Sequence, residues 1–291
     1  MTVELSPVKR PLLRWYGGKW KLAPKLLRFF PSHRIYVEPF GGAGSVLLRK
    51  QRCYAEVWND LDGEAVNLFE VLRDDAQACR LVEQLRLTPF AREEFEQSFE
   101  LANDPVERAR RLIVLSFMGF GTNAHSRYHT GFRSNGHRGG TTPAHDWKNY
   151  PEVLPFAIER LRDVTIEATD AKKCMAKHDS PRTLHYVDPP YVMSTRWKGD
   201  PTGRERRGYV HELSDDDHAK LLTFLRGLKG MVVLSAYAHP IYERALAGWR
   251  RIELATYADG ARPRTEIVWL NQATVAALGD GPLYNRSTEA E

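Results

Sequence analysis

Short apolar segments alternate with amphipathic ones along most of the chain. Six segments have the length and the apolar or β-branched content of strands, and the stretches between them carry apolar residues at helical spacing. Strands that alternate with helices form a mostly parallel sheet covered on both faces, so the pattern predicts an α/β fold. The strand-like segments are IYVE (35–38), YAEVWND (54–60), VTIEATD (164–170), TLHYVD (183–188), GMVVLSAY (230–237) and RTEIVWLN (264–271).

Three local signals place helices between these strands. EPFGGAGSVLLRK (38–50) predicts a glycine turn that leads into a helix. In NDPVERARRLIVLSFMG, Asp104 is expected to be the N-cap and Pro105 to lie in the first turn. In LSDDDHAKLLTFLRGLKG, Ser214 and Asp217 have the spacing of a capping box.

The alternation is interrupted by a mainly helical stretch, 74–160, which we expect to be an inserted subdomain. The flanking parts, 1–73 and 161–278, would then form one discontinuous α/β domain. Within the insert, 119–145 is a loop rich in Gly, Arg and His, and the polar tail 279–291 is expected to fray.

Composition narrows the classes of protein without naming one. The 291 residues are 42% hydrophobic and 27% charged, as in ordinary globular proteins, and the net charge of +5 with a pI of about 9.0 mildly favours a polyanionic partner. No apolar run approaches the roughly 20 residues of a membrane span, and no signal peptide can be identified. The three scattered cysteines support neither disulfides nor a zinc site, so we expect a cytoplasmic protein. Neither a heptad pattern nor an obvious apolar patch can be identified, so the sequence leaves the oligomeric state open; a monomer or weak dimer is the expectation.

The glycine turn after the first strand suits backbone amides that approach a ligand closely. Gly42 and Gly44 fit the dinucleotide fingerprint G-x-G-x-x-G, but Leu47 takes its last position, which weakens an oxidoreductase interpretation. Glu38 would repel phosphates and attract an ammonium group, whereas Asp60 stands where an acid commonly binds ribose hydroxyls. A ligand with a ribose, an ammonium and no phosphate, such as S-adenosylmethionine, meets these needs. The alternative is a plain strand–helix turn with exposed acids.

The stretch HYVDPPYV (185–192) joins a buried strand to a carboxylate, two prolines and a phenol: Asp188, Pro189, Pro190 and Tyr191. Two adjacent prolines end the strand and stiffen the corner, because neither can donate a backbone hydrogen bond. Such a corner could hold a carboxylate, a free carbonyl and a ring rigidly at the strand's C-terminal end. The alternative is a turn that only closes the strand.

Two basic segments are candidates for contact with nucleic acid, because arginines and interleaved aromatics suit phosphates and bases. The alternative for each is a solvated surface loop. Histidines in the first segment lack the spacing of a known metal site, so no metal is predicted. The candidates are Asn123, Arg127, Tyr128, Arg133 and Arg138 in the first segment, and Arg196, Lys198, Arg204, Arg206 and Arg207 in the second.

The segments RWYGGKWKL, YVEPFGGAGSVLL, NDLD and YVDPPY occur in an order that resembles the Dam-type (D12 class, α group) DNA adenine-N6 methyltransferases. The resemblance covers about residues 12–272, with YVHELSDDDHAKLL, VVLSAY and TEIVWLN similar to later segments of the family. It implies a Rossmann-like S-adenosylmethionine-dependent fold with the target-recognition region inserted. It also implies cofactor contacts at Trp15, Tyr16, Gly17, Gly18, Lys19, Glu38, Pro39, Phe40, Gly41, Gly42, Gly44, Asp60, Asp170 and Asp188.

By this resemblance, Asp188 and the Pro189 carbonyl would accept the two protons of an adenine N6, and Tyr191 would stack on a base flipped out of duplex DNA. The insert only loosely resembles the family's recognition hairpin, so the target sequence is open. A cognate restriction endonuclease acting on the same site is the other partner considered. The alternatives are methylation of cytosine N4 or of RNA adenine, a catalytically silent DNA-binding relative and, more distantly, a nicotinamide oxidoreductase. Asp188 favours adenine, since cytosine-N4 enzymes more often have Ser there.

Overall fold

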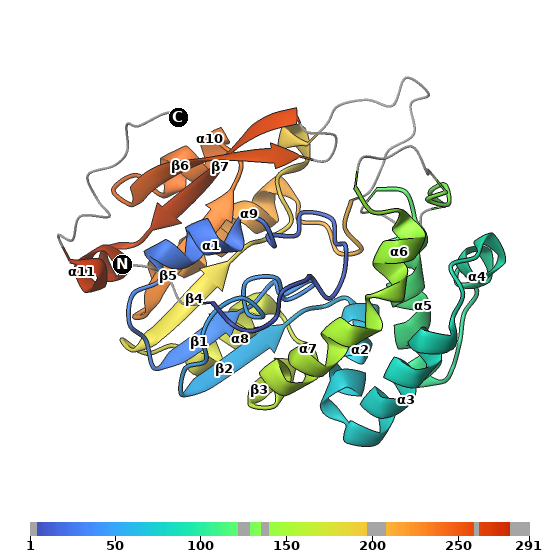
Figure 1. The fold of residues 1–291 in the computed structure, drawn as a ribbon. Coiled ribbons are helices and arrows are strands. Elements are labelled where there is room, and N and C mark those ends of the chain that lie inside the picture. The colour runs from blue at the N-terminus through green and yellow to red at the C-terminus, as the bar shows by residue number, and fades with distance from the viewer. Residues whose placement is uncertain (1–4, 122–128, 135–139, 197–207, 259–261, 280–291) are drawn as a thin grey trace.

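A seven-stranded sheet lies at the centre of the computed structural model, which describes residues 5–121, 129–134, 140–196, 208–258 and 262–279. The strand order is β3-β2-β1-β4-β5-β7-β6 (Figure 1). The first five strands in this order are parallel, and β7 is antiparallel to both of its neighbours. The predicted mostly parallel α/β sheet is therefore confirmed. The strands are β1 (Ile35–Glu38), β2 (Ala55–Asn59), β3 (Val164–Glu167), β4 (Thr183–Val187), β5 (Met231–Ala236), β6 (Arg250–Ala258) and β7 (Arg262–Leu270).

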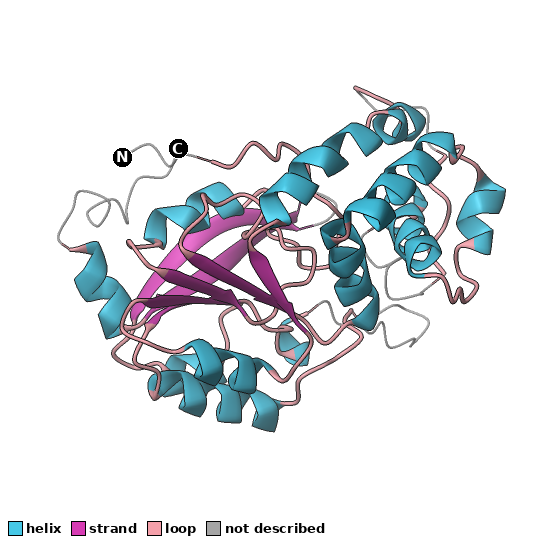
Figure 2. Ribbon diagram, turned by 90° about the horizontal axis from the view of Figure 1, so that it is seen from below, coloured by secondary structure: helices cyan, strands magenta, loops and turns pink. Residues whose placement is uncertain are grey.

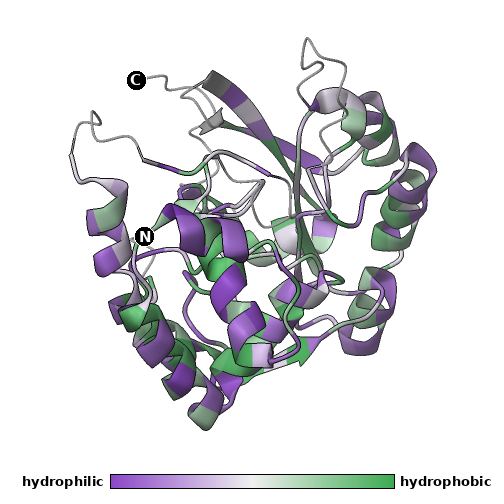
Figure 3. Ribbon diagram, turned by 90° about the vertical axis from the view of Figure 1, so that its right-hand side faces the viewer, coloured by the Kyte–Doolittle hydropathy of each residue, from purple (hydrophilic) through white to green (hydrophobic). Residues whose placement is uncertain are grey.

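Helices cover both faces of this sheet (Figure 2). Successive side chains of a strand point to opposite faces, so Tyr36 and Val37 of β1, like Tyr186 and Val187 of β4, belong to different apolar clusters. Along the helices, hydrophilic stretches generally face outward and hydrophobic ones inward (Figure 3). The helices of the flanking parts are α1 (Ala23–Leu26), α2 (Gly63–Arg73), α8 (Ala171–His178), α9 (Asp215–Arg226), α10 (Pro240–Ala245) and α11 (Gln272–Leu278), with short 3₁₀ turns η1 (Leu27–Phe29) and η4 (Met193–Thr195).

Between β2 and β3 the chain forms the predicted helical stretch, which lies beside the β3 edge of the sheet in Figure 1. Its apolar side chains, such as Leu85 and Ile113, belong to the same cluster as Tyr36 and Trp58 of the sheet. The insert thus shares its core with one sheet face, and the proposed domain limits stay a prediction. In the described part of the chain, the insert contains α3 (Asp75–Leu87), α4 (Arg92–Gln97), α5 (Pro105–Met118), α6 (Pro143–Lys148), the 3₁₀ turn η3 (Pro151–Val153) and α7 (Leu154–Leu161).

The predicted helix starts have the expected chemistry. Asp104 accepts the backbone N–H of Glu107 at 3.0 Å and Pro105 is the first residue of α5. At the start of α9, Ser214 and Asp217 form the reciprocal hydrogen bonds of a capping box. Both predictions are confirmed.

One predicted element needs correction, and one strand is missing from the prediction. After the glycine turn, residues 45–49 form turns instead of the expected helix. The N–H groups of Leu48 and Lys50 do bond carbonyls four residues earlier, but the Leu47 N–H donates to Glu38 Oε2 at 2.9 Å instead. The edge strand β6 was not predicted at all. Its side chains from Arg251 to Thr256 alternate between exposed and half-buried, so this strand lacks the apolar run that identified the others.

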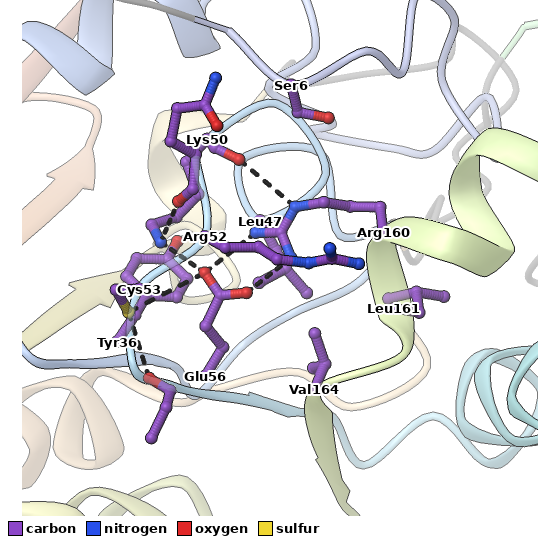
Figure 4. Close-up of polar contacts among 12 residues, drawn as sticks. Ser6, Tyr36, Leu47, Lys50, Arg52, Cys53, Glu56, Arg160, Leu161 and Val164 are labelled. Carbon is purple, nitrogen blue, oxygen red and sulfur yellow. Dashed lines mark hydrogen bonds and ion pairs between the residues drawn. The ribbon is translucent and has the colours of Figure 1, made fainter.

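A buried ion cluster joins the insert to the sheet (Figure 4). Glu56 of β2 accepts two hydrogen bonds from the guanidinium of Arg160 on α7 and one from the Lys50 ammonium, which follows the glycine turn. All three side chains are at most 4% exposed.

No helix in the described part of the chain is long and apolar enough to cross a membrane.

Candidate active site

Most of the predicted ligand-binding residues surround one cavity at the C-terminal ends of β1, β2 and β4. Ligands commonly bind at this edge of an open α/β sheet, because the loops that follow parallel strands meet there. Of the predicted cofactor residues, those that line the cavity are Trp15, Tyr16, Gly17, Gly18, Lys19, Glu38, Pro39, Phe40, Gly41, Gly42, Asp60 and Asp188. Pro190 of the corner lines it as well.

The glycine turn brings its backbone close to two tryptophans. A Cβ at Gly41 would lie 2.0 Å from Nε1 of Trp58, and one at Gly42 would lie 2.7 Å from Nε1 of Trp15. Gly42 also has a φ of 48°, in the region that favours glycine. No side chain fits at either position, so the backbone of the turn forms the wall of the cavity.

Glu38 is a buried acid at the end of β1, 3% exposed. Its Oε2 accepts hydrogen bonds from the Tyr36 hydroxyl at 2.8 Å and from the Leu47 N–H at 2.9 Å. Burial nevertheless dominates and raises the pKa of Glu38 to about 8. A cationic group in the cavity, such as the ammonium that the sequence predicts near Glu38, would favour the ionised form of this carboxylate.

Asp60 lies at the end of β2 and fixes two turns at once. Its Oδ2 accepts the Gly42 N–H at 2.7 Å, and its Oδ1 accepts the Asp62 N–H at 2.8 Å. Burial raises the pKa of Asp60 in spite of these hydrogen bonds. The acid therefore holds the glycine turn in place as well as lining the cavity.

Asp188 lies at the corner after β4, and its two oxygens have different partners. Oδ2 lies 2.9 Å from the Lys19 ammonium, and Oδ1 accepts the Ser235 hydroxyl at 3.1 Å. Lys19 also donates to the Gly17 carbonyl at 2.8 Å, which ties the N-terminal loop to the corner. Burial raises the pKa of Asp188 above its usual range, although Lys19 opposes that change.

A second buried carboxylate, Glu266 of β7, belongs to the same group and was not predicted. It is 3% exposed, lies 3.9 Å from the Lys19 ammonium and accepts the Tyr191 hydroxyl. Burial raises the pKa of Glu266, and the nearby charge of Asp188 adds to that effect. An acid inside the otherwise apolar segment TEIVWLN was the signal that could have identified it.

The Tyr191 ring is 4% exposed and packs edge-to-face on Tyr237, with centroids 4.5 Å apart. The Lys19 ammonium lies 4.7 Å from the centre of the Tyr191 ring. Neither Tyr191 nor Pro189 lines the cavity, so the stacking of Tyr191 on a base stays a prediction.

Two residues expected to bind the cofactor lie outside the cavity lining. A Cβ at Gly44 would lie 2.8 Å from the Phe69 ring of α2, so Gly44 is needed for packing of the turn on that helix. Asp170 is exposed and caps α8 by accepting the N–H groups of Lys172 and Lys173. Its neighbour Ala171 lines the cavity instead.

The segment 208–213, which follows the second basic run, forms another wall that the sequence analysis did not assign. Tyr209, Val210, His211 and Leu213 line the cavity. In the sequence, these residues stand out only as part of YVHELSDDDHAKLL, which carries no predicted site residue. Other lining residues that were missed are Ala43, Ser45, Val46, Asn59, Leu61 and Asp62.

Only two of the candidate nucleic-acid contacts lie in the described part of the chain. The N–H of Arg133 donates to the Met118 carbonyl at 2.8 Å, and its guanidinium donates to the Phe117 carbonyl at 3.0 Å, which fixes it beside the end of α5. Arg196 has a 10% exposed side chain with partners inside the protein, so its contact with DNA stays a prediction. The others, which are Asn123, Arg127, Tyr128, Arg138, Lys198, Arg204, Arg206 and Arg207, lie outside the described residues.

Comparison with known proteins gives one consistent family. Residues 15–245 match the family described as D12 class N6 adenine-specific DNA methyltransferase. The chain is 27% identical over 192 residues to a protein named DNA adenine methylase from Vibrio cholerae serotype O1, covering 63% of this chain and 66% of that protein. It is 30% identical over 195 residues to the protein of that name from Serratia marcescens, covering 63% and 67%. It is 27% identical over 192 residues to the protein of that name from Escherichia coli (strain K12), covering 63% of this chain and 65% of that protein. The matched region thus spans just under two thirds of the Vibrio and Escherichia relatives.

Proposed function

This chain belongs to the D12 class N6 adenine-specific DNA methyltransferase family, and from this premise we propose that it transfers a methyl group from S-adenosylmethionine to N6 of an adenine in duplex DNA. The observation that carries the proposal is the position of Asp188. This carboxylate lines the same cavity as Glu38, Asp60 and the glycine turn, so one cavity joins a methyl-donor site to a proton acceptor.

The residues of the cavity fit S-adenosylmethionine on chemical grounds. Its amino-acid ammonium would lie near Glu38, whose buried carboxylate gains from a cation, and its ribose near Asp60. The walls made of Gly41 and Gly42 offer backbone atoms and no side chains. When bound, the donor supplies a methyl group already activated by a positively charged sulfur, so the transfer needs no metal.

The corner would supply the acceptors for the nucleophile. Adenine N6 is a weak nucleophile because its lone pair is delocalised into the ring, and acceptors for its two protons localise that pair. We propose Asp188 and the Pro189 carbonyl as these acceptors, held rigidly by the two prolines. In the transfer, the N6–methyl bond would form as the carbon–sulfur bond of the donor breaks with its electron pair left on sulfur, and Asp188 would accept the proton that N6 loses.

The adenine would have to leave the duplex to reach this cavity, which costs a few kcal/mol that stacking and hydrogen bonds offset. We propose residues 1–73 and 161–278 as the catalytic part, and 74–160 with its loop 119–145 as the part that recognises the target. The protein would work in the cytoplasm as a monomer or weak dimer. A cognate restriction endonuclease is an additional proposed partner.

Expression in a bacterial host free of adenine methylation tests this function, with methylation-sensitive sequencing of the host DNA as the measurement. We expect N6-methyladenine within one short motif, which also supplies the target sequence. Well-expressed, folded protein that leaves the DNA unmodified would contradict the proposal and would favour an RNA acceptor or a silent DNA-binding protein. Nucleoside digestion separates N6-methyladenine from N4-methylcytosine.

Asp188→Ala tests the role of the corner in the same host and in vitro. Loss of the acceptor is expected to lower the transfer rate at least about a hundredfold, in line with the removal of one preorganised electrostatic group. Binding of S-adenosylhomocysteine, measured by calorimetry, should be partly retained because the rest of the cavity remains. An equal loss of binding and transfer would mean that Asp188 mainly holds the donor.

A further inference from the structure

Arg196 directly follows the 3₁₀ turn after the DPPY corner and makes its contacts inside the protein. Its guanidinium donates from Nε to the Tyr191 carbonyl at 2.7 Å, and a second N–H donates to the same oxygen. The remaining N–H groups form a two-pronged pair with Glu212, at 2.7 and 2.6 Å. A planar fork that binds a carboxylate in this way is much more specific in geometry than a single contact.

Glu212 connects this pair to the wall of the cavity. Its Oε1 also accepts the backbone N–H of Tyr209 at 3.1 Å, and the Arg196 guanidinium lies 4.8 Å from the centre of the Tyr209 ring. The Tyr209 ring meets Tyr16 edge-on, with centroids 5.1 Å apart. Its hydroxyl lies 2.5 Å from where a Cβ of Gly17 would be, so Gly17 makes room for it.

These contacts form one continuous connection from the corner to the donor cavity. It passes from the Tyr191 carbonyl to Arg196, from there to Glu212, and on to Tyr209 above Gly17. We propose that Arg196 and Glu212 form an ionic latch that holds 208–213 over the donor cavity and fixes the DPPY corner, so that Arg196 is a positioning residue and not a DNA contact. This inference rests on the proposed function for the identity of the ligand.

The burial of the pair decides between these two roles. The side chains of Arg196 and Glu212 are 10% and 19% exposed, whereas an arginine that binds phosphate must offer its guanidinium to the solvent side. Breaking a half-buried, hydrogen-bonded charge pair leaves the other charge without its partner. The segment 208–213 would then lose the contacts that Glu212 makes with Arg196.

The test uses Arg196→Gln, the milder Arg196→Lys and Glu212→Gln in the full chain. Arg251→Gln is the matched control, because Arg251 on the edge strand β6 also forms ion pairs with glutamates, in its case Glu243 of α10 and Glu253 of β6. Three quantities are measured: hydrogen exchange of the peptide that covers 208–213 in the ligand-free protein, affinity for S-adenosylhomocysteine, and affinity for duplex DNA across a salt series.

For Arg196→Gln and Glu212→Gln we expect exchange at 208–213 to be at least about tenfold faster and S-adenosylhomocysteine to bind at least about tenfold more weakly. Arg196→Lys should be intermediate, since an ammonium cannot reproduce the fork. DNA affinity and its salt dependence should match those of the control in all variants.

Unchanged exchange at 208–213 in both Arg196→Lys and Glu212→Gln would overturn the latch, as would a loss of DNA affinity with a smaller salt slope for the Arg196 variants alone. Hydrogen exchange is measured without any ligand, so it reports on the latch even in a chain that transfers no methyl group. Wild-type protein without methyl transfer would count against the proposed function only.

Discussion

At the scale of single residues, the site is built from acids that are buried or half-buried. Glu38, Asp60, Asp188 and Glu266 all have raised pKa values, and burial is the main cause in each case. Lys19 is the cation between Asp188 and Glu266. A site with several buried carboxylates favours positively charged ligands, which is consistent with a sulfonium donor.

Glu38→Gln tests how much one such buried acid lowers the unfolding free energy as pH rises. A carboxylate whose pKa is raised from 4.5 to about 8 in the folded state stabilises the fold fully only below the pKa of the unfolded chain. The unfolding free energy of the wild type should therefore fall as pH rises from about 4.5 to 8, by up to about 4 kcal/mol from this residue. Urea unfolding of the ligand-free protein between pH 5 and 9 measures it.

In Glu38→Gln this fall should be much smaller, because no proton is exchanged at position 38. The exposed Glu253→Gln is the control, and its pH dependence should follow the wild type. Parallel curves for Glu38→Gln and the wild type would mean that Glu38 titrates in the folded protein much as it does in the unfolded chain.

At the scale of elements, the sequence predicts most of the sheet and the motifs at its C-terminal edge. β1, β2, β4 and β5 are short apolar runs that end in recognisable turns, so local pattern and tertiary role agree. The failures occur where a tertiary contact decides the outcome. The turns that follow the glycine turn depend on the hydrogen bond from the Leu47 N–H to Glu38. Glu266 and the segment 208–213 are far from the other site residues in the sequence and come close to them only in the folded chain.

The capping box of α9 offers an element-scale prediction, because this helix begins directly after the latch segment. Ser214→Ala removes the side chain that accepts the Asp217 N–H, which should destabilise the protein by about 1 kcal/mol. Thr223→Ala is the control, because Thr223 lies on the same helix and only bonds back to the Ala219 carbonyl. Urea unfolding should give a measurable loss for Ser214→Ala and a change near zero for Thr223→Ala, whereas equal values would mean that the cap contributes nothing.

At the scale of the whole molecule, the insert and the sheet share one apolar core and one buried ion cluster. Glu56 binds Lys50 on the chain that leaves the glycine turn and Arg160 on the last helix of the insert (Figure 4). Burial opposes the ionised form of Glu56, but Arg160 and Lys50 outweigh it and lower its pKa. The cluster therefore links the proposed recognition part to the proposed donor site.

Glu56→Gln tests this link, because it leaves two buried cations without their anion. The expected loss of unfolding free energy is about 3–5 kcal/mol, the usual cost of breaking a buried pair by removing one partner. Glu152→Gln is the control: it breaks the pair with Arg86, whose side chains are 55% and 67% exposed, and should cost less than about 1 kcal/mol. If both variants lost the same unfolding free energy, the cluster would not hold the insert on the sheet. The second readout is binding. If Glu56→Gln alone lost stability and also lost both DNA binding and donor binding, the insert and the proposed donor site would be coupled through the cluster.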